Sequence, residues 1–262
     1  MHIIINVYSK KLIYGGETME NLQFECKEYK LYSPDSLKYI TDNMYNILIS
    51  KIREYKELFD VEHLEQIQIN YFDDKDKFRN YIYKLRGESK SLPEYATGTY
   101  DNDMVNTYIE KDIPMNSIKY QKRLYTANHE LFHILYKKYI LKGNYQNRII
   151  WYDEGMAQFF SGEKDYILDK DSFKNFYSYV KGNTKYTPNL NIIKHASSFV
   201  NDLYNGYDLS YLCVRYLSEI LNSDEFKALL SNFDRIREYG TTIVENMFTY
   251  YDNKLNIGGK LK

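Results

Sequence analysis

The sequence of 262 residues contains only two cysteines, four prolines and one tryptophan. Cys26 and Cys213 lie nearly two hundred residues apart, so a disulfide framework and a cysteine-based zinc cluster are excluded. Long apolar runs are also missing. No stretch approaches the ~18 consecutive apolar residues that a membrane-spanning helix requires. We therefore expect no membrane span.

An excess of charge of either sign is missing as well. Lys and Arg number 35 against 36 Asp and Glu, for a formal net charge of -1, so no overall positive field recruits nucleic acid or anionic lipid. Residues 1–8 lack the basic start and the small-residue cleavage site of a signal peptide. This favours a cytoplasmic protein, although an export signal removed beforehand would leave the same sequence.

The chain is rich in residues that build a core. Hydrophobic residues make up 44% of it and aromatic residues 17%, which excludes a disordered chain. Period-2 patterns predict strands, and apolar residues three or four positions apart predict helices. The expected elements are strands over 2–8 and 22–31, paired around Gly15–Gly16; a helix over 37–59; a strand over 66–72; a helix over 74–86 ending at Gly87; and a hairpin of 95–100 and 105–110 around 101–103.

From Asn116 onward the pattern is almost entirely helical. Strands come first and helices follow, which is typical of an α+β fold. We predict one catalytic domain over 1–262, with a sheet-containing part over 1–115 and a helical part over 116–262.

Residues 129–133 read His-Glu-Leu-Phe-His, an HExxH motif. On a helix, residues four positions apart share a face, so His129 and His133 can bind one cation and Glu130 can hold a water against it. The helix context is independent of the motif. Three features around the motif predict this helix. Asn116 or Ser117 can cap its start and Gly143 can end it. A buried stripe runs along it, made of Leu124, Ala127, Leu131 and Leu135.

A catalytic zinc site needs three protein ligands, and Glu154 in the segment 151–160 is the candidate for the third. The intervening residues suffice to finish the first helix, turn at 143–144 and return along a second helix. Small residues at Gly155 and Ala157 are expected to let the second helix approach the first closely.

HExxH followed by W-x-x-E-G-x-A resembles the gluzincin metallopeptidases of the peptidase MA type, which include thermolysin-like, aminopeptidase-like and clostridial collagenase-like enzymes. The similarity spans about residues 39–250. It implies a zincin-like fold, Zn²⁺ bound by His129, His133 and Glu154, and Glu130 as the general base. It also implies that a strand within 97–109 pairs with the substrate backbone.

Two departures narrow the resemblance. Gln158 stands where some gluzincins carry an acid that orients a zinc-bound histidine. The spacing from His133 to Glu154 is also slightly longer than in the aminopeptidase branch. In addition, the amine-binding glutamate of zinc aminopeptidases is missing, because 19–21 lies far upstream and 96–100 has none, so an endopeptidase is preferred. Peptide deformylase needs a cysteine ligand near the motif, which this chain does not have.

A tyrosine near the start of the helix after the third ligand faces the zinc in this family. Tyr207 is our choice as the oxyanion donor, with Tyr204 and Tyr211 as rivals and His195 as a further candidate.

The predicted function is zinc-dependent hydrolysis of a peptide or protein substrate by metal-activated water. Two alternatives stay open: a catalytically idle zinc-binding interaction module, and an aminopeptidase without the usual amine anchor. A purely structural zinc site has no use for a glutamate such as Glu130 beside the first histidine.

Overall fold

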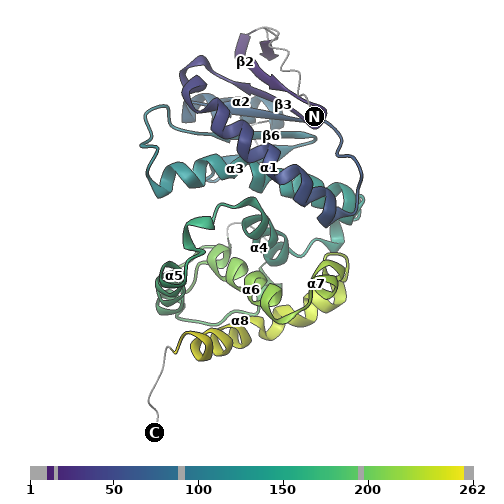
Figure 1. The fold of residues 1–262 in the computed structure, drawn as a ribbon, viewed down its shortest axis with the longest axis vertical. Coiled ribbons are helices and arrows are strands. Elements are labelled where there is room, and N and C mark those ends of the chain that lie inside the picture. Colours follow the sequence, from purple (N-terminus) through teal and green to yellow (C-terminus); the bar gives the residue numbers. More distant parts are fainter. Residues whose placement is uncertain (1–10, 15–16, 88–91, 194–197, 257–262) are drawn as a thin grey trace. The chain divides into compact units, whose positions relative to one another are not determined.

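The computed structural model describes residues 11–14, 17–87, 92–193 and 198–256. The chain divides into two compact units, residues 1–134 and residues 135–262. The first carries the strands and the second is helical, so the fold is α+β, as predicted (Figure 1). Among the described residues, no helix is long and apolar enough to cross a membrane.

A six-stranded mixed sheet forms the first unit, in the order β1-β2-β3-β4-β6-β5. Pairs β3–β4 and β4–β6 are parallel, and the other pairs are antiparallel. Within the described sheet, β5 is therefore an edge strand. The bounds are β1 Lys11–Tyr14, β2 Glu17–Glu25, β3 Tyr29–Ser33, β4 Ile67–Phe72, β5 Gly98–Asp101 and β6 Met104–Tyr108.

The predicted single strand over 22–31 is wrong. β2 ends at Glu25, and the chain reverses into β3, with the Cys26 amide donating to the Tyr29 carbonyl at 2.8 Å. The polar residue Glu28 leaves the strand pattern here to pair with Lys56 at 2.8 Å. The predicted strand over 2–8 and the turn at 15–16 lie outside the described residues.

The other predictions for this unit are confirmed with shifted ends. The predicted helix over 37–59 begins as a 3-10 helix, Asp35–Ile40, and continues as α1, Thr41–Phe59. Helix α2, Lys75–Arg86, is capped by the Asp74 side chain and ends at Gly87. Strand β4 and the β5–β6 hairpin also form as expected.

Helices cover both faces of the sheet (Figure 1). On one face, α2 packs Phe78, Tyr81 and Ile82 against Phe72 of β4. Alternation along β4 sends Ile69 to the opposite face. That face is covered by α1 together with α3, Ile118–Leu135, whose Phe132 ring lies 6.3 Å from Tyr55 of α1.

The second unit is built around α6. Tyr177 of α5 donates its hydroxyl to Asp252 of α8 at 2.8 Å, and Lys164 pairs with Asp208 of α6 at 2.7 Å. Both Lys164 and Asp208 are largely buried, which ties the start of α6 to the segment after α4. The bounds are α4 Ile150–Ser161, α5 Lys170–Asn183, α6 Gly206–Ile220, α7 Ser223–Leu229 and α8 Phe233–Leu255.

Candidate metal centre

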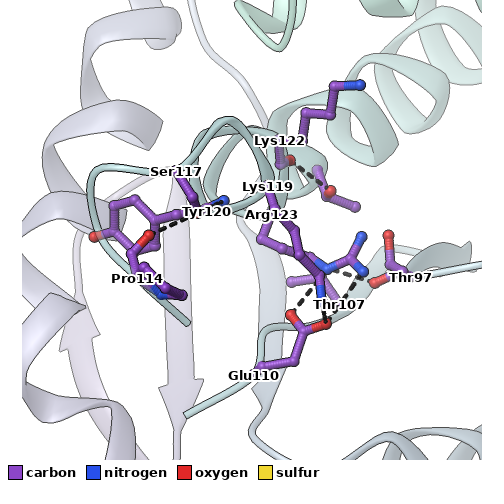
Figure 2. Close-up of polar contacts among 10 residues, drawn as sticks. Thr97, Thr107, Glu110, Pro114, Ser117, Lys119, Tyr120, Lys122 and Arg123 are labelled. Atoms are coloured by element: carbon purple, nitrogen blue, oxygen red, sulfur yellow. Dashed lines mark hydrogen bonds and ion pairs between the residues drawn. The ribbon is translucent and has the colours of Figure 1, made fainter. Parts of the chain in front are cut away.

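The helix that carries the HExxH motif, α3, is fixed at its start by two polar anchors (Figure 2). The Ser117 hydroxyl accepts a hydrogen bond from the Tyr120 amide at 3.0 Å, so Ser117 is the N-cap of α3. Glu110, which follows β6, pairs with Lys119 at 2.8 Å and Arg123 at 3.1 Å. Burial alone would raise the pKa of Glu110, but hydrogen bonds from Arg123 and Lys119 lower it to about 2. These contacts fix α3 to the sheet.

The two histidines of the motif converge. Nε2 of His129 lies 3.1 Å from Nε2 of His133, and the ring centroids are 4.9 Å apart. His133 is 4% exposed. The core stripe predicted for this helix is also buried: Leu124, Ala127, Leu131 and Leu135.

Strand β5 runs directly beneath the motif. A Cβ atom at Gly98 would lie 2.9 Å from Oε1 of Glu130, so only a glycine leaves room for that carboxylate as it stands. The Tyr100 ring lies 5.5 Å from the His133 ring. Gly98 and Tyr100 share the face of β5 that meets α3.

Gly98 and Tyr100 also direct their backbone groups to the open edge of the sheet. The Tyr108 amide donates to the Thr97 carbonyl at 2.8 Å, which makes these two residues a hydrogen-bonded pair of β5 and β6. Bonding alternates along an antiparallel ladder. The next residue, Gly98, therefore turns its amide and carbonyl away from β6, and so does Tyr100.

Arg86, the last residue of α2, closes one end of this edge. Its guanidinium pairs with Asp101 at 2.5 Å and donates to the Tyr100 carbonyl at 3.2 Å and to the Thr99 hydroxyl. One outward-facing carbonyl is thus already occupied. The amide and carbonyl of Gly98 face the same edge.

Glu154 stands in the early part of α4, next to the buried acid Asp153. The Arg148 guanidinium reaches both carboxylates: Nε donates to Oδ2 of Asp153 at 2.5 Å, and Nη2 lies 3.5 Å from Oε1 of Glu154. Negative side chains are favourable at the start of a helix. The third predicted ligand is therefore held in a charged setting that the motif alone does not reveal.

Gly155 serves a different contact from the one expected. A Cβ atom there would lie 2.5 Å from the Ser210 carbonyl oxygen and 2.7 Å from Cγ2 of Val214, both on α6. The small residue lets α4 approach α6. The predicted reason for this glycine, a close approach to the motif helix, is therefore corrected.

Gln158 ties α4 to the first turn of α6. Its side-chain amide donates to the Tyr207 carbonyl at 2.9 Å and, more weakly, to the Glu154 carbonyl at 3.4 Å. Gln158 is 2% exposed. One buried amide thus links the backbones of Glu154 and Tyr207.

The three tyrosine candidates differ in their surroundings. Tyr207 is half-buried, and its ring lies 4.6 Å from the Phe199 ring. Tyr204 is buried and directs its hydroxyl to the Ser198 carbonyl at 3.5 Å. Tyr211 is buried, and its hydroxyl accepts from Arg215 at 3.4 Å. The fourth candidate, His195, lies outside the described residues.

Among the described residues, His129, His133 and Glu154 form a group that could hold a metal ion. Each offers one ligand atom, and these atoms lie within 4.8 Å of one another. Two imidazoles and one carboxylate are a donor set that catalytic zinc sites use. In a tetrahedral site with Zn–N bonds of about 2.0–2.1 Å, two nitrogens lie about 3.3 Å apart. The 3.1 Å between the histidine nitrogens fits this value.

Sequence reasoning missed Arg148, Asp153 and Gly98. The signal for Asp153 was present, since an acid beside a proposed ligand in an otherwise apolar helix needs a partner. Gly98 stood in the segment considered for substrate pairing, but its closeness to Glu130 depends on strand order.

Comparison with models of known protein families shows which family this chain belongs to. The family model for collagenase, of peptidase family M9, matches residues 43–257. This chain belongs to the collagenase family of peptidases. Collagenases of this family are zinc metallopeptidases. The match includes all of the motif residues and Glu154, and it begins upstream of β4.

A solved structure of an aminopeptidase N family protein from Idiomarina loihiensis is similar at 14% identity with a TM-score of 0.49. The match covers 90% of this chain and 41% of the other, so this collagenase-family chain spans about two fifths of the length of that protein. No curated protein matches the chain.

Proposed function

We propose that this chain is a zinc-dependent endopeptidase in which His129, His133 and Glu154 hold the metal ion. The observation that carries the proposal is the grouping of these three ligand atoms within 4.8 Å, in a chain of the collagenase family. We further propose that residues 1–262 form one catalytic domain. Peptides or proteins are the substrates of such an enzyme.

The proposed chemistry divides between the metal and the chain. When bound, the ion supplies a Lewis acid that polarises the scissile carbonyl and lowers the pKa of water. Glu130 is the general base: it takes the proton of the attacking water and passes it to the leaving amine. Its carboxylate lies against Gly98 of the edge strand, where an extended peptide would run.

The edge strand β5 offers the substrate a short ladder. Gly98 presents both an amide and a carbonyl to the open edge. An extended peptide added there would form an antiparallel or parallel pair by backbone hydrogen bonds alone. The substrate backbone would be oriented beside Glu130 with little dependence on side-chain identity.

Tyr207 is the proposed donor to the oxyanion. The tie from Gln158 to the backbones of Glu154 and Tyr207 supports this choice, because it sets the first turn of α6 relative to a ligand.

Metal analysis of three variants tests the ligands and the base separately. The parent should hold about one zinc per chain, and His129→Ala or Glu154→Ala should lose most of it. Glu130→Gln should keep the zinc while peptide hydrolysis falls by about 10²–10⁴. Parent-rate cleavage by Glu130→Gln would overturn the base assignment.

A peptide-library digest with and without chelator tests the class of reaction. Internal cleavage that chelator abolishes supports the endopeptidase. Release of single N-terminal residues would instead indicate an aminopeptidase. Stoichiometric zinc with no cleavage of any library peptide would favour the idle zinc-binding module.

A further inference from the structure

We propose that Arg148 is a positioning residue that holds the Glu154 carboxylate in the orientation required for metal binding. The inference rests on the proposed function, since it takes Glu154 as a ligand. It adds a residue that lies outside the ligand set and that no motif indicated.

The geometry is that of one guanidinium shared by two neighbouring acids. Arg148 lies two positions before the first residue of α4, and its side chain returns along the first turn of that helix. Nε contacts Asp153 at 2.5 Å, and Nη2 lies 3.5 Å from Oε1 of Glu154. A guanidinium can do this because its donors lie in one rigid plane.

Asp153 serves as the anchor of this arrangement. Its side chain is 2% exposed, whereas that of Arg148 is 29% exposed. A buried carboxylate is stable only when it is paired, so Asp153 fixes Nε of Arg148 and thereby the plane of the whole guanidinium. The position of Nη2 beside Glu154 follows from that plane.

The consequence for metal binding follows from the conformational freedom of the Glu154 side chain. A Glu side chain has several rotamers, and the site must select one of them each time an ion binds. A cation fixed beside Oε1 of Glu154 restricts this choice before the ion arrives. Residues that orient a metal ligand in this way commonly change metal affinity by about 10–100-fold.

Substitution at position 148 is sterically tolerable. Arg148 borders a cavity of about 370 Å³ whose wall also includes Ile149, Leu190 and Arg237. A shorter side chain enlarges this hollow and displaces no neighbour.

The decisive comparison is between Asp153→Asn and the double variant Arg148→Gln/Asp153→Asn. The side-chain oxygen of the asparagine still accepts a hydrogen bond from Nε of Arg148, so the anchor remains in Asp153→Asn. Both variants lack the buried negative charge, so neither leaves an unpaired buried carboxylate, and they differ only at residue 148. The zinc dissociation constant is measured by chelator competition, and the Co²⁺ absorption spectrum reports ligand geometry. We expect the double variant to bind zinc at least tenfold more weakly than Asp153→Asn, with an altered Co²⁺ spectrum.

Equal zinc affinities and equal Co²⁺ spectra for the two variants would overturn the proposal, because Arg148 would then act on the fold through Asp153 alone. Circular dichroism checks folding. Should the double variant not fold, Arg148→Lys/Asp153→Asn replaces it: lysine keeps the charge but loses the planar fork, and the same tenfold criterion applies. A parent protein that binds no zinc would instead refute the proposed function itself.

Discussion

Gly98 on the edge strand lies directly beneath the carboxylate of Glu130 on the motif helix, and a Cβ atom at position 98 would come within 2.9 Å of Oε1. Gly98→Ala should therefore displace the general base while both histidines stay in place. A catalytic group misplaced by about 1 Å can cost about 100-fold in rate. We expect kcat to fall by about this factor with zinc content unchanged, as measured by steady-state kinetics and metal analysis.

The added methyl group would also meet Cγ2 of Thr126, so this second collision needs its own control. Thr126→Ser removes that methyl and keeps the hydroxyl that donates to the Lys122 carbonyl at 2.9 Å. The double variant with Gly98→Ala should stay slow. Recovery of the parent rate would assign the defect to Thr126 and not to Glu130.

Tyr207→Phe should lower kcat by about a hundredfold, the usual loss when one oxyanion donor is removed. KM should change little, because the hydrogen bond strengthens as charge develops in the transition state. The phenylalanine ring preserves the packing against Phe199. Steady-state kinetics on a cleaved peptide gives both constants.

Tyr204→Phe and Tyr211→Phe are the matched controls, and both should keep kcat within a fewfold of the parent. A normal kcat for Tyr207→Phe beside a collapsed one for either control would move the role to that residue. Normal values for all three would leave His195 as the next candidate.

Gly155→Ala should destabilise the protein without touching a proposed ligand atom. The new methyl would lie 2.5 Å from the Ser210 carbonyl oxygen, and such overpacking costs about 1–3 kcal/mol. The control is Gly182→Ala, where nothing lies within 4 Å and the residue belongs to helix α5. That change should stabilise by about 0.5–1 kcal/mol. Thermal unfolding gives the melting temperature of each variant. Shifts of both melting temperatures in the same direction would contradict the α4–α6 packing described above.

Glu110→Gln should change how stability depends on pH. The folded pKa of Glu110 is lowered from 4.5 to about 2, so its carboxylate stabilises the fold above pH 4.5, and this contribution is lost as pH falls towards 2. The variant should therefore be less stable than the parent at pH 7, and the difference should vanish near pH 2. Urea unfolding across this range measures it.

Glu57→Gln is the control for the pH experiment. Glu57 pairs with Arg53 at 2.7 Å, but both side chains are well exposed. Solvent screens exposed pairs of this kind, so they contribute little to stability and the parent and Glu57→Gln unfolding curves should nearly coincide at every pH. A pH dependence in Glu57→Gln as large as in Glu110→Gln would show that partial burial beside Lys119 and Arg123 is not the cause.

The sequence predicts well what depends on spacing within one element. His129 and His133 converge because a helix brings residues four positions apart to one face, and no other part of the chain is needed to know this. Asp74 and Gly87 likewise mark the ends of α2 by local chemistry. Of the predicted site residues, His129, His133 and Glu154 have ligand atoms within 4.8 Å of one another, and their role as ligands stays a prediction.

Contacts between different helices and strands cannot be predicted from the spacing of residues within one element. Spacing assigns Gly155 to the wrong neighbouring helix, because a small residue indicates a close approach between helices but not which helix is the partner. The strand expected over 22–31 contains a turn, at which Glu28 pairs with Lys56 of α1, a residue far along the chain. The position of the Arg148 side chain depends on its contacts with Asp153 and Glu154, which no motif indicates.

Strand β5 also bears on solubility. An edge with unsatisfied backbone groups can add a strand from another copy of the same chain as readily as it can add a peptide, and this is a common route to aggregation. Arg86 occupies the Tyr100 carbonyl and places an ion pair with Asp101 at the end of that edge. β5 has only four residues, and very short edge strands are one of the ways in which proteins limit edge-to-edge pairing. The proposed binding of a peptide at this strand is therefore compatible with resistance to polymerisation.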